Sequence, residues 1–217
     1  MTDDLLKCSV LATHTIANVS ETLARKLELP EGHRSIGILT ADSDDVTYCA
    51  LDEATKAAAV EVVYGRSLYA GAANASTRLA GEVIGILAGP NPAEVSAGLR
   101  AAVEFIDGGA GFRSANPDDS VVYFAHTVSR TGSYRSRTAG VREGEALAYL
   151  IAPPLEAVVG LDEALKASDV ELVAFFEPPS ETIFGGGLLT GTQSACKAAC
   201  EAFAEAVKAV AERPREV

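Results

Sequence analysis

Large aromatic side chains are scarce in this chain of 217 residues. Tryptophan is absent, and the only aromatic residues are seven Phe and six Tyr. A core must therefore be built by close packing of Ala, Val, Leu and Ile. Hydrophobic residues make up 48% of the chain and charged residues 22%, which is typical of a folded globular protein and excludes a disordered one.

Basic residues are also few: 18 Lys and Arg stand against 30 Asp and Glu, for a net charge of −12. A nucleic-acid-binding protein must neutralise phosphates with a basic face, so we expect no nucleic-acid partner. The acidic balance instead suits a protein that handles small cationic or neutral molecules.

No apolar run approaches the ~20 residues that span a bilayer. The best candidate, 147–155, is interrupted by Pro153 and Pro154, and the first residues are acidic where a secretory signal would be basic. We therefore expect no membrane association and a cytoplasmic location. The four cysteines include no Cys-x-x-Cys pair, and Cys196 and Cys200 share an apolar helical stripe, which predicts buried core thiols.

Signatures of catalysis are lacking as well. The chain has no nucleophile elbow, no dinucleotide-binding fingerprint and no His-Glu-x-x-His sequence, so we predict that it is not an enzyme.

What the chain does contain is an internal repeat. Residues 51–63 and 161–173 are identical at nine of thirteen positions, at an offset of 110 residues. Each copy alternates between period 2 and period 3.6 and reads strand, helix, strand, loop, strand, helix. Asn91 and Thr192 are expected to cap the last helix of each copy. We predict an α/β (α+β, ferredoxin-like) fold made of two domains, residues 1–110 and 111–217.

Two glycine clusters interrupt these patterns. Residues 108–111 lie between the copies and are interpreted as a hinge or turn. Residues 185–187 are followed by no Gly-Lys-Ser/Thr, so they form no phosphate-binding loop and are interpreted as a tight loop between strands.

Several strings resemble the tandem-domain shell proteins of bacterial microcompartments (BMC), and among them those of ethanolamine utilisation in particular. They are residues 41–48, 60–71, 89–94, 128–134 and 188–200, and the resemblance covers nearly the whole chain. The order of elements is that of a circularly permuted BMC domain in each copy. The resemblance implies a non-catalytic homotrimer with pseudo-hexagonal outline, which tiles with other shell proteins and carries a gated central pore and small pores.

The resemblance also implies site residues. Those of the small pore, which would bind ethanolamine, are Asp44, Asp45, Glu82 and Phe112. Those of the loops that line and gate the central pore are Arg66, Ser67, Tyr69, Thr182, Ile183 and Phe184. Carboxylates suit an ammonium ligand because they form charge-assisted hydrogen bonds with it. No cofactor is required and no metal site is expected, but cobalamin at the central pore and adventitious zinc are left open.

Other interpretations of the same residues stay open. The acidic string at 42–45 is by itself typical of a solvated turn, and it does not fit a calcium loop because Thr47 stands where an EF-hand needs glycine. The chain as a whole could be a shell protein of another microcompartment type, or a discrete trimeric small-molecule sensor. A sensor would remain a separate trimer, whereas a shell protein would assemble laterally.

Overall fold

The structure, a computed structural model, describes residues 2–67, 82–178 and 184–215. The chain divides into two compact units, each described here by itself. The first-half unit comprises residues 8–110 with 132–135, and the second-half unit comprises residues 1–7, 111–131 and 136–217. The compact units thus exchange two short segments relative to a division at residue 110, and the domain boundary itself stays a prediction.

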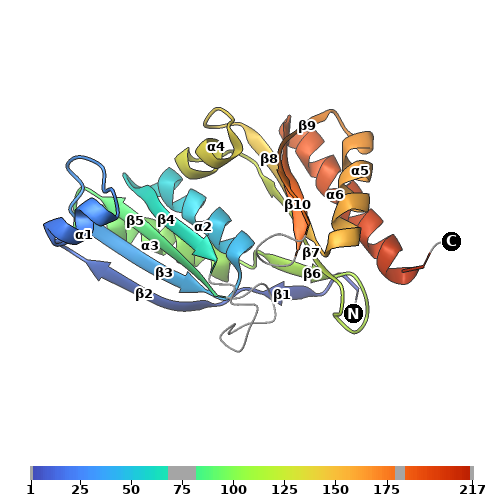
Figure 1. The fold of residues 1–217 in the computed structure, drawn as a ribbon, viewed down its shortest axis with the longest axis horizontal. Helices are drawn as coiled ribbons and strands as arrows, with labels where there is room; N and C mark the ends of the chain where they lie inside the picture. Colours follow the sequence, from blue (N-terminus) through green and yellow to red (C-terminus); the bar gives the residue numbers. More distant parts are fainter. Residues whose placement is uncertain (1, 68–81, 179–183, 216–217) are drawn as a thin grey trace. The chain divides into compact units, whose positions relative to one another are not determined.

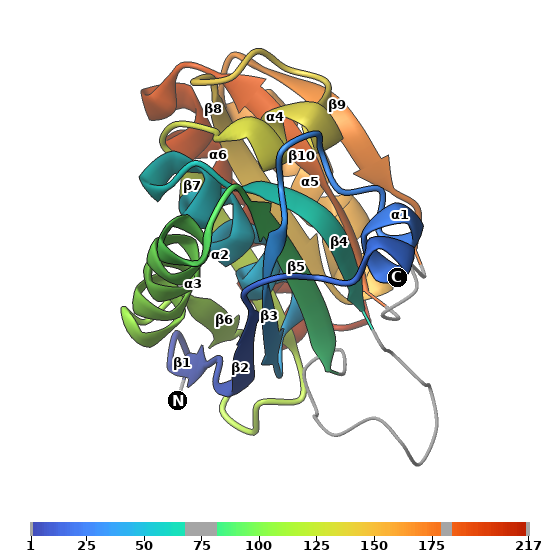
Figure 2. The same ribbon diagram turned by 90° about the vertical axis from the view of Figure 1, so that its left-hand side faces the viewer.

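The first-half unit contains a four-stranded antiparallel sheet in the order β2-β3-β5-β4. Helices α2 and α3 lie side by side against this sheet (Figure 2). The elements are β2 (Val10–Ile16), α1 (Glu21–Lys26), β3 (Ser35–Ala41), α2 (Asp44–Ala57), β4 (Glu61–Ser67), β5 (Val83–Gly89) and α3 (Pro92–Asp107).

Glycines in the sheet let both helices approach one face. A Cβ at Gly85 would meet the Leu51 side chain of α2 at 2.7 Å, and one at Gly37 would meet Val95 of α3 at 2.7 Å. The opposite face carries a smaller apolar cluster around Ile36 and Ile86, which the α1 segment helps to cover. The sheet is therefore buried on both sides, although unequally.

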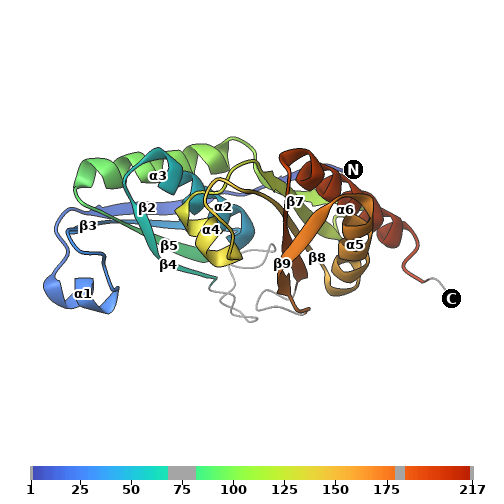
Figure 3. The ribbon, with the colours of Figure 1, turned by 90° about the horizontal axis from the view of Figure 1, so that it is seen from above.

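The second-half unit contains a six-stranded antiparallel sheet in the order β1-β6-β7-β8-β10-β9. Helices α5 and α6 pack side by side (Figures 1 and 3), and their apolar stripes close the core. The elements are β1 (Leu5–Lys7), β6 (Gly111–Ser114), β7 (Val122–Val128), α4 (Ser133–Ala139), β8 (Ala146–Ala152), α5 (Pro154–Ala167), β9 (Val170–Phe176), β10 (Gly185–Gly191) and α6 (Gln193–Glu212). The first three residues of α4 belong to the first-half unit.

The repeat is visible in the topology. The strand order β2-β3-β5-β4 of one unit recurs as β7-β8-β10-β9 in the other, and α2 and α3 correspond to α5 and α6. The expected order of elements in each copy is confirmed. Both predicted caps are present as well, because Asn91 accepts hydrogen bonds from Ala93 N and Glu94 N, and Thr192 accepts one from Ala195 N.

The interpretation of residues 185–187 as a loop is wrong, because they begin β10, which pairs with both β8 and β9. Close backbone packing explains the glycines: a Cβ at Gly186, whose φ is +153°, would lie 1.9 Å from the carbonyl oxygen of Leu150. The hinge at 108–111 is only partly a turn, since Gly108 caps α3 and Gly111 already begins β6.

Candidate functional site

Strand register brings three of the predicted small-pore residues to one end of the first-half sheet. Ala41 of β3 pairs with Val83 of β5, and Val83 pairs with Ser67 of β4. Asp44 and Asp45 follow β3 closely, and Glu82 directly precedes β5. Asp45 and Glu82, which are 37 positions apart in the sequence, therefore lie at the same end of the sheet.

Asp44 and Asp45 form the first turn of α2 and are almost fully buried, at 4% and 5% exposure. Asp45 N donates to Asp44 Oδ1 over 2.9 Å, and the Ser67 hydroxyl also hydrogen-bonds the Asp44 carboxyl. The alternative of a solvated acidic turn is therefore wrong for this pair. Their position at a helix N-terminus favours negative charge, whereas their burial opposes it.

At Asp44 the effect of burial outweighs that of the helix N-terminus. Burial first, and the neighbouring charge of Asp45 second, raise the pKa of the Asp44 carboxyl to about 8, although hydrogen bonds from backbone N–H groups and Ser67 act in the opposite direction. Burial likewise raises the pKa of Tyr48, one turn along α2, and the charge of Asp44 adds to this. The start of α2 is thus a place where negative charge is costly and a cation would be favoured.

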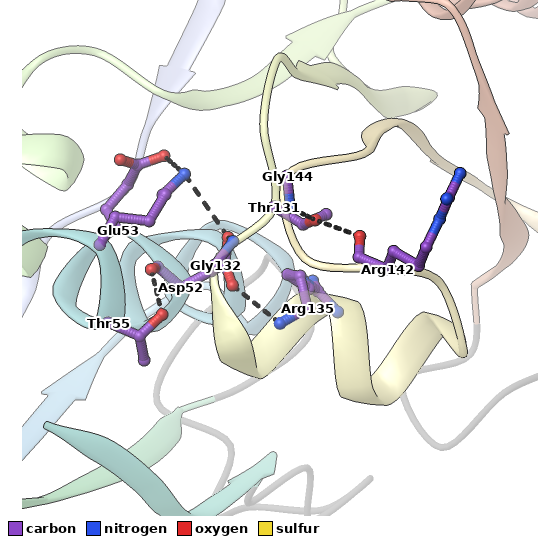
Figure 4. A network of polar contacts seen from close by, with 9 residues as sticks. Asp52, Glu53, Thr55, Thr131, Gly132, Arg135, Arg142 and Gly144 are labelled. Carbon is purple, nitrogen blue, oxygen red and sulfur yellow. Dashed lines mark hydrogen bonds and ion pairs between the residues drawn. The ribbon is translucent and has the colours of Figure 1, made fainter.

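A second polar arrangement along α2 was not predicted from the sequence. Asp52, 1% exposed, accepts hydrogen bonds of 2.8 Å from Gly132 N through Oδ2 and from Arg135 N through Oδ1 (Figure 4). The guanidinium carbon of Arg135 lies 5.5 Å from the centre of the Tyr48 ring and 6.0 Å from that of Tyr134. The segment 132–135 is thereby fixed against α2.

Phe112 and Phe184 belong to the second-half unit, not to the unit that holds the acidic residues. Phe112 is fully buried, and its ring centre lies 5.5 Å from that of Phe124 and 5.8 Å from that of Phe184. Phe184 is 9% exposed, and its ring packs against Phe112. Cobalamin at the central pore stays a prediction from the family resemblance.

Of the predicted pore-loop residues, Arg66 and Ser67 end β4, and Arg66 is exposed with its guanidinium carbon 5.9 Å from the centre of the Tyr64 ring. Tyr69, Thr182 and Ile183 lie outside the described residues. A hollow of about 660 Å³ lies between α5 and α6 and contains none of the predicted site residues.

Within the described residues, no three His, Cys, Asp or Glu side chains gather as metal ligands would, and no helix is both long and apolar enough to cross a bilayer. The four cysteines are free thiols, as predicted, and all four are buried, whereas the sequence predicted burial only for Cys196 and Cys200. Burial raises the pKa of Cys8 to about 12 and that of Cys49 to about 11.

Known proteins resemble this chain along its whole length. A model of the BMC domain matches residues 35–115. The bacterial microcompartment shell protein EutL of Clostridium perfringens is 68% identical over 214 residues, 99% of each chain, and that of Salmonella typhimurium is 57% identical over 211 residues, 97% of this chain and 96% of the other. The crystal structure of ethanolamine utilization protein EutL from Leptotrichia buccalis matches all of both chains with a TM-score of 0.95 and 69% identity.

Proposed function

This chain belongs to the family of bacterial microcompartment shell proteins with BMC domains, and we propose that it forms a trimeric tile in the shell of an ethanolamine-utilisation compartment. It is a structural component of the microcompartment shell and, like these relatives, not an enzyme. The relatives' names, together with 57–69% identity, support the choice of ethanolamine over another compartment type.

Two features support the trimer. Three chains with two similar units each can form a pseudo-sixfold ring, which lets the two sets of loops differ. Large apolar side chains are also exposed on α5 and β9, where a neighbouring copy would cover them: Leu155, Val158, Val159, Leu165, Leu172 and Phe175. We propose that the sequences between β4 and β5 and between β9 and β10, which occupy equivalent places in the two copies, line the central pore.

The small pore is the part of the proposal that this structure supports best. It is supported by strand register, which puts Asp44, Asp45 and Glu82 at the same end of the first-half sheet, and by the burial of the two aspartates. An ammonium group would neutralise this charge and form charge-assisted hydrogen bonds with the carboxylates. We propose that these residues bind ethanolamine weakly, since a permeant molecule must also leave. The role of Phe112, which belongs to the second-half unit, stays a prediction from the family resemblance.

Titration calorimetry with ethanolamine tests the binding. The wild type should bind, and Asp45→Ala should lose the binding because one of the two buried carboxylates is removed. Asp42→Asn is the matched control, because Asp42 lies in the same acidic string but its Oδ1 accepts a hydrogen bond from Ser9 N over 2.7 Å. Unchanged binding in Asp45→Ala would contradict the site.

Negative-stain microscopy tests the tile. Purified protein at high concentration should form sheets with a regular hexagonal lattice. Particles that remain separate trimers under all conditions, and that still bind a small molecule, would instead favour a sensor.

A further inference from the structure

The Asp44 carboxyl poses an electrostatic problem. It is 4% exposed and adjacent to a second buried carboxyl, and within the described residues no Lys, Arg or His forms an ion pair with it. An isolated buried carboxylate costs several kcal/mol, so such a group either holds a proton or binds a cation.

Among the residues that the structure describes, the surroundings of Asp44 offer hydrogen bonds but no positive charge in direct contact. Its Oδ1 accepts from Asp45 N, and the Ser67 hydroxyl bonds the same carboxyl. Arg135 lies beyond Tyr48, over the ring of that residue. The ionisable or hydrogen-bonding side chains that face Asp44 or its neighbour Tyr48 are Asp45 and Tyr48 of α2, Ser67 of β4, and Tyr134 and Arg135 of segment 132–135.

We propose that Asp44 is protonated in the ligand-free protein and releases this proton when an ammonium ligand binds beside Asp45. The inference rests on the small-pore binding proposed above. The O–H bond of the Asp44 carboxyl breaks, the proton passes to solvent buffer, and the incoming cation replaces its charge. The site carries one net negative charge both before and after, counting the bound cation, so the exchange adds no second uncompensated carboxylate.

The direction of the pKa shift agrees with this exchange. Burial and the charge of Asp45 raise the pKa of Asp44 to about 8, so the acid form predominates at neutral pH. A bound cation favours the ionised form and would lower the same pKa. Proton and ligand therefore compete for one position, and apparent affinity should rise about tenfold between pH 6 and pH 7.

Calorimetry in buffers of different ionisation enthalpy measures the exchange. Ethanolamine is titrated into the full-length protein in phosphate, HEPES and Tris at pH 6.5 and at pH 8. The dependence of the heat on buffer enthalpy should give about one proton released at pH 6.5 and about half a proton at pH 8. In Asp44→Asn, whose amide mimics the neutral acid, proton release should be lost and affinity should no longer depend on pH, whereas Asp42→Asn should behave as the wild type.

Infrared difference spectra provide a second measurement. The carbonyl band of a protonated carboxyl should be present in ligand-free wild type, absent from Asp44→Asn, and lost from the wild type at saturating ethanolamine. Binding with no dependence on buffer, and no such band, would overturn the proton exchange and leave the ligand in place. No binding in any buffer would overturn the ligand itself, and the exchange with it.

Discussion

Asp52 and Asp162 occupy the same position in the two copies of the repeated string, yet their surroundings differ. Asp52 is 1% exposed and accepts two backbone hydrogen bonds from segment 132–135. The side chain of Asp162 is 60% exposed and pairs with Lys166 on the surface of α5. The same residue is therefore a buried structural acceptor in one unit and a solvated surface charge in the other.

Replacing Asp52 and Asp162 in turn should therefore have different effects on the free energy of unfolding. Asp52→Ala leaves the N–H groups of Gly132 and Arg135 buried without their acceptor, so unfolding free energy should fall by about 2–4 kcal/mol. Asp162→Ala removes an exposed ion pair and should change it by less than about 0.5 kcal/mol. Urea denaturation of both variants measures the difference, and equal effects would contradict the assignment.

Asp44 should also make stability depend on pH. Its pKa in the folded protein is raised to about 8, above the value of ~3.9 in an unfolded chain. Between about pH 4 and pH 8 the folded state therefore binds more protons than the unfolded state. The free energy of unfolding consequently falls as pH rises through that window. Relative to wild type, Asp44→Asn should gain stability steadily from pH 5 to pH 8 in urea titrations. A constant difference at every pH would show that Asp44 keeps an ordinary pKa.

At the scale of elements, β10 depends on glycine for two separate reasons. Gly186 has a φ of +153°, and a Cβ there would lie 1.9 Å from Leu150 O of the neighbouring strand β8. Gly32 also has a positive φ, +82°, but a Cβ there would meet no atom within 4 Å. Comparing the two positions separates backbone strain from collision.

We expect Gly32→Ala to cost about 1–2 kcal/mol, because alanine only has to adopt a left-handed conformation. Gly186→Ala should cost more than about 3 kcal/mol, because β10 must also move away from β8. Thermal unfolding followed by circular dichroism measures both. If the two variants lose the same stability, the close contact between β10 and β8 does not contribute to the cost of Gly186→Ala.

The elements that could be predicted are those whose signals are local. The caps at Asn91 and Thr192 depend on a side chain and an N–H group two or three residues away, and both are present as predicted. The start of β10 was missed because three glycines carry no alternation of apolar and polar side chains, and only pairing with distant strands makes them a strand.

The candidate site also has features that the sequence predicts and features that depend on distant contacts. Residue type and family resemblance pointed to Asp44, Asp45 and Glu82, and strand register brings them to one end of the sheet. Their burial could not be predicted, since consecutive aspartates are typical of exposed turns. The role of Asp52 had no signal either, because its partners are 80 and 83 residues away.

At the scale of the whole molecule, the distribution of exposed apolar side chains differs between the units. Of the nine large apolar side chains described as exposed, six lie on α5 and β9 of the second-half unit. Single exposed apolar residues are ordinary on a monomer, but a group on two consecutive elements is typical of a surface that another chain covers. The proposed trimer provides such a chain in every copy.

A charge placed in this group should therefore prevent assembly. Val158 is 50% exposed on α5, and Val158→Glu would bury a carboxylate without a partner at the proposed contact between copies. Leu23→Glu is the matched control, because Leu23 is 41% exposed on α1 of the first-half unit and does not belong to this group. By size-exclusion chromatography with light scattering, wild type and Leu23→Glu should be trimers, and Val158→Glu should be a folded monomer. A trimer in Val158→Glu would mean that α5 faces solvent in the assembled tile and that other elements hold the copies together.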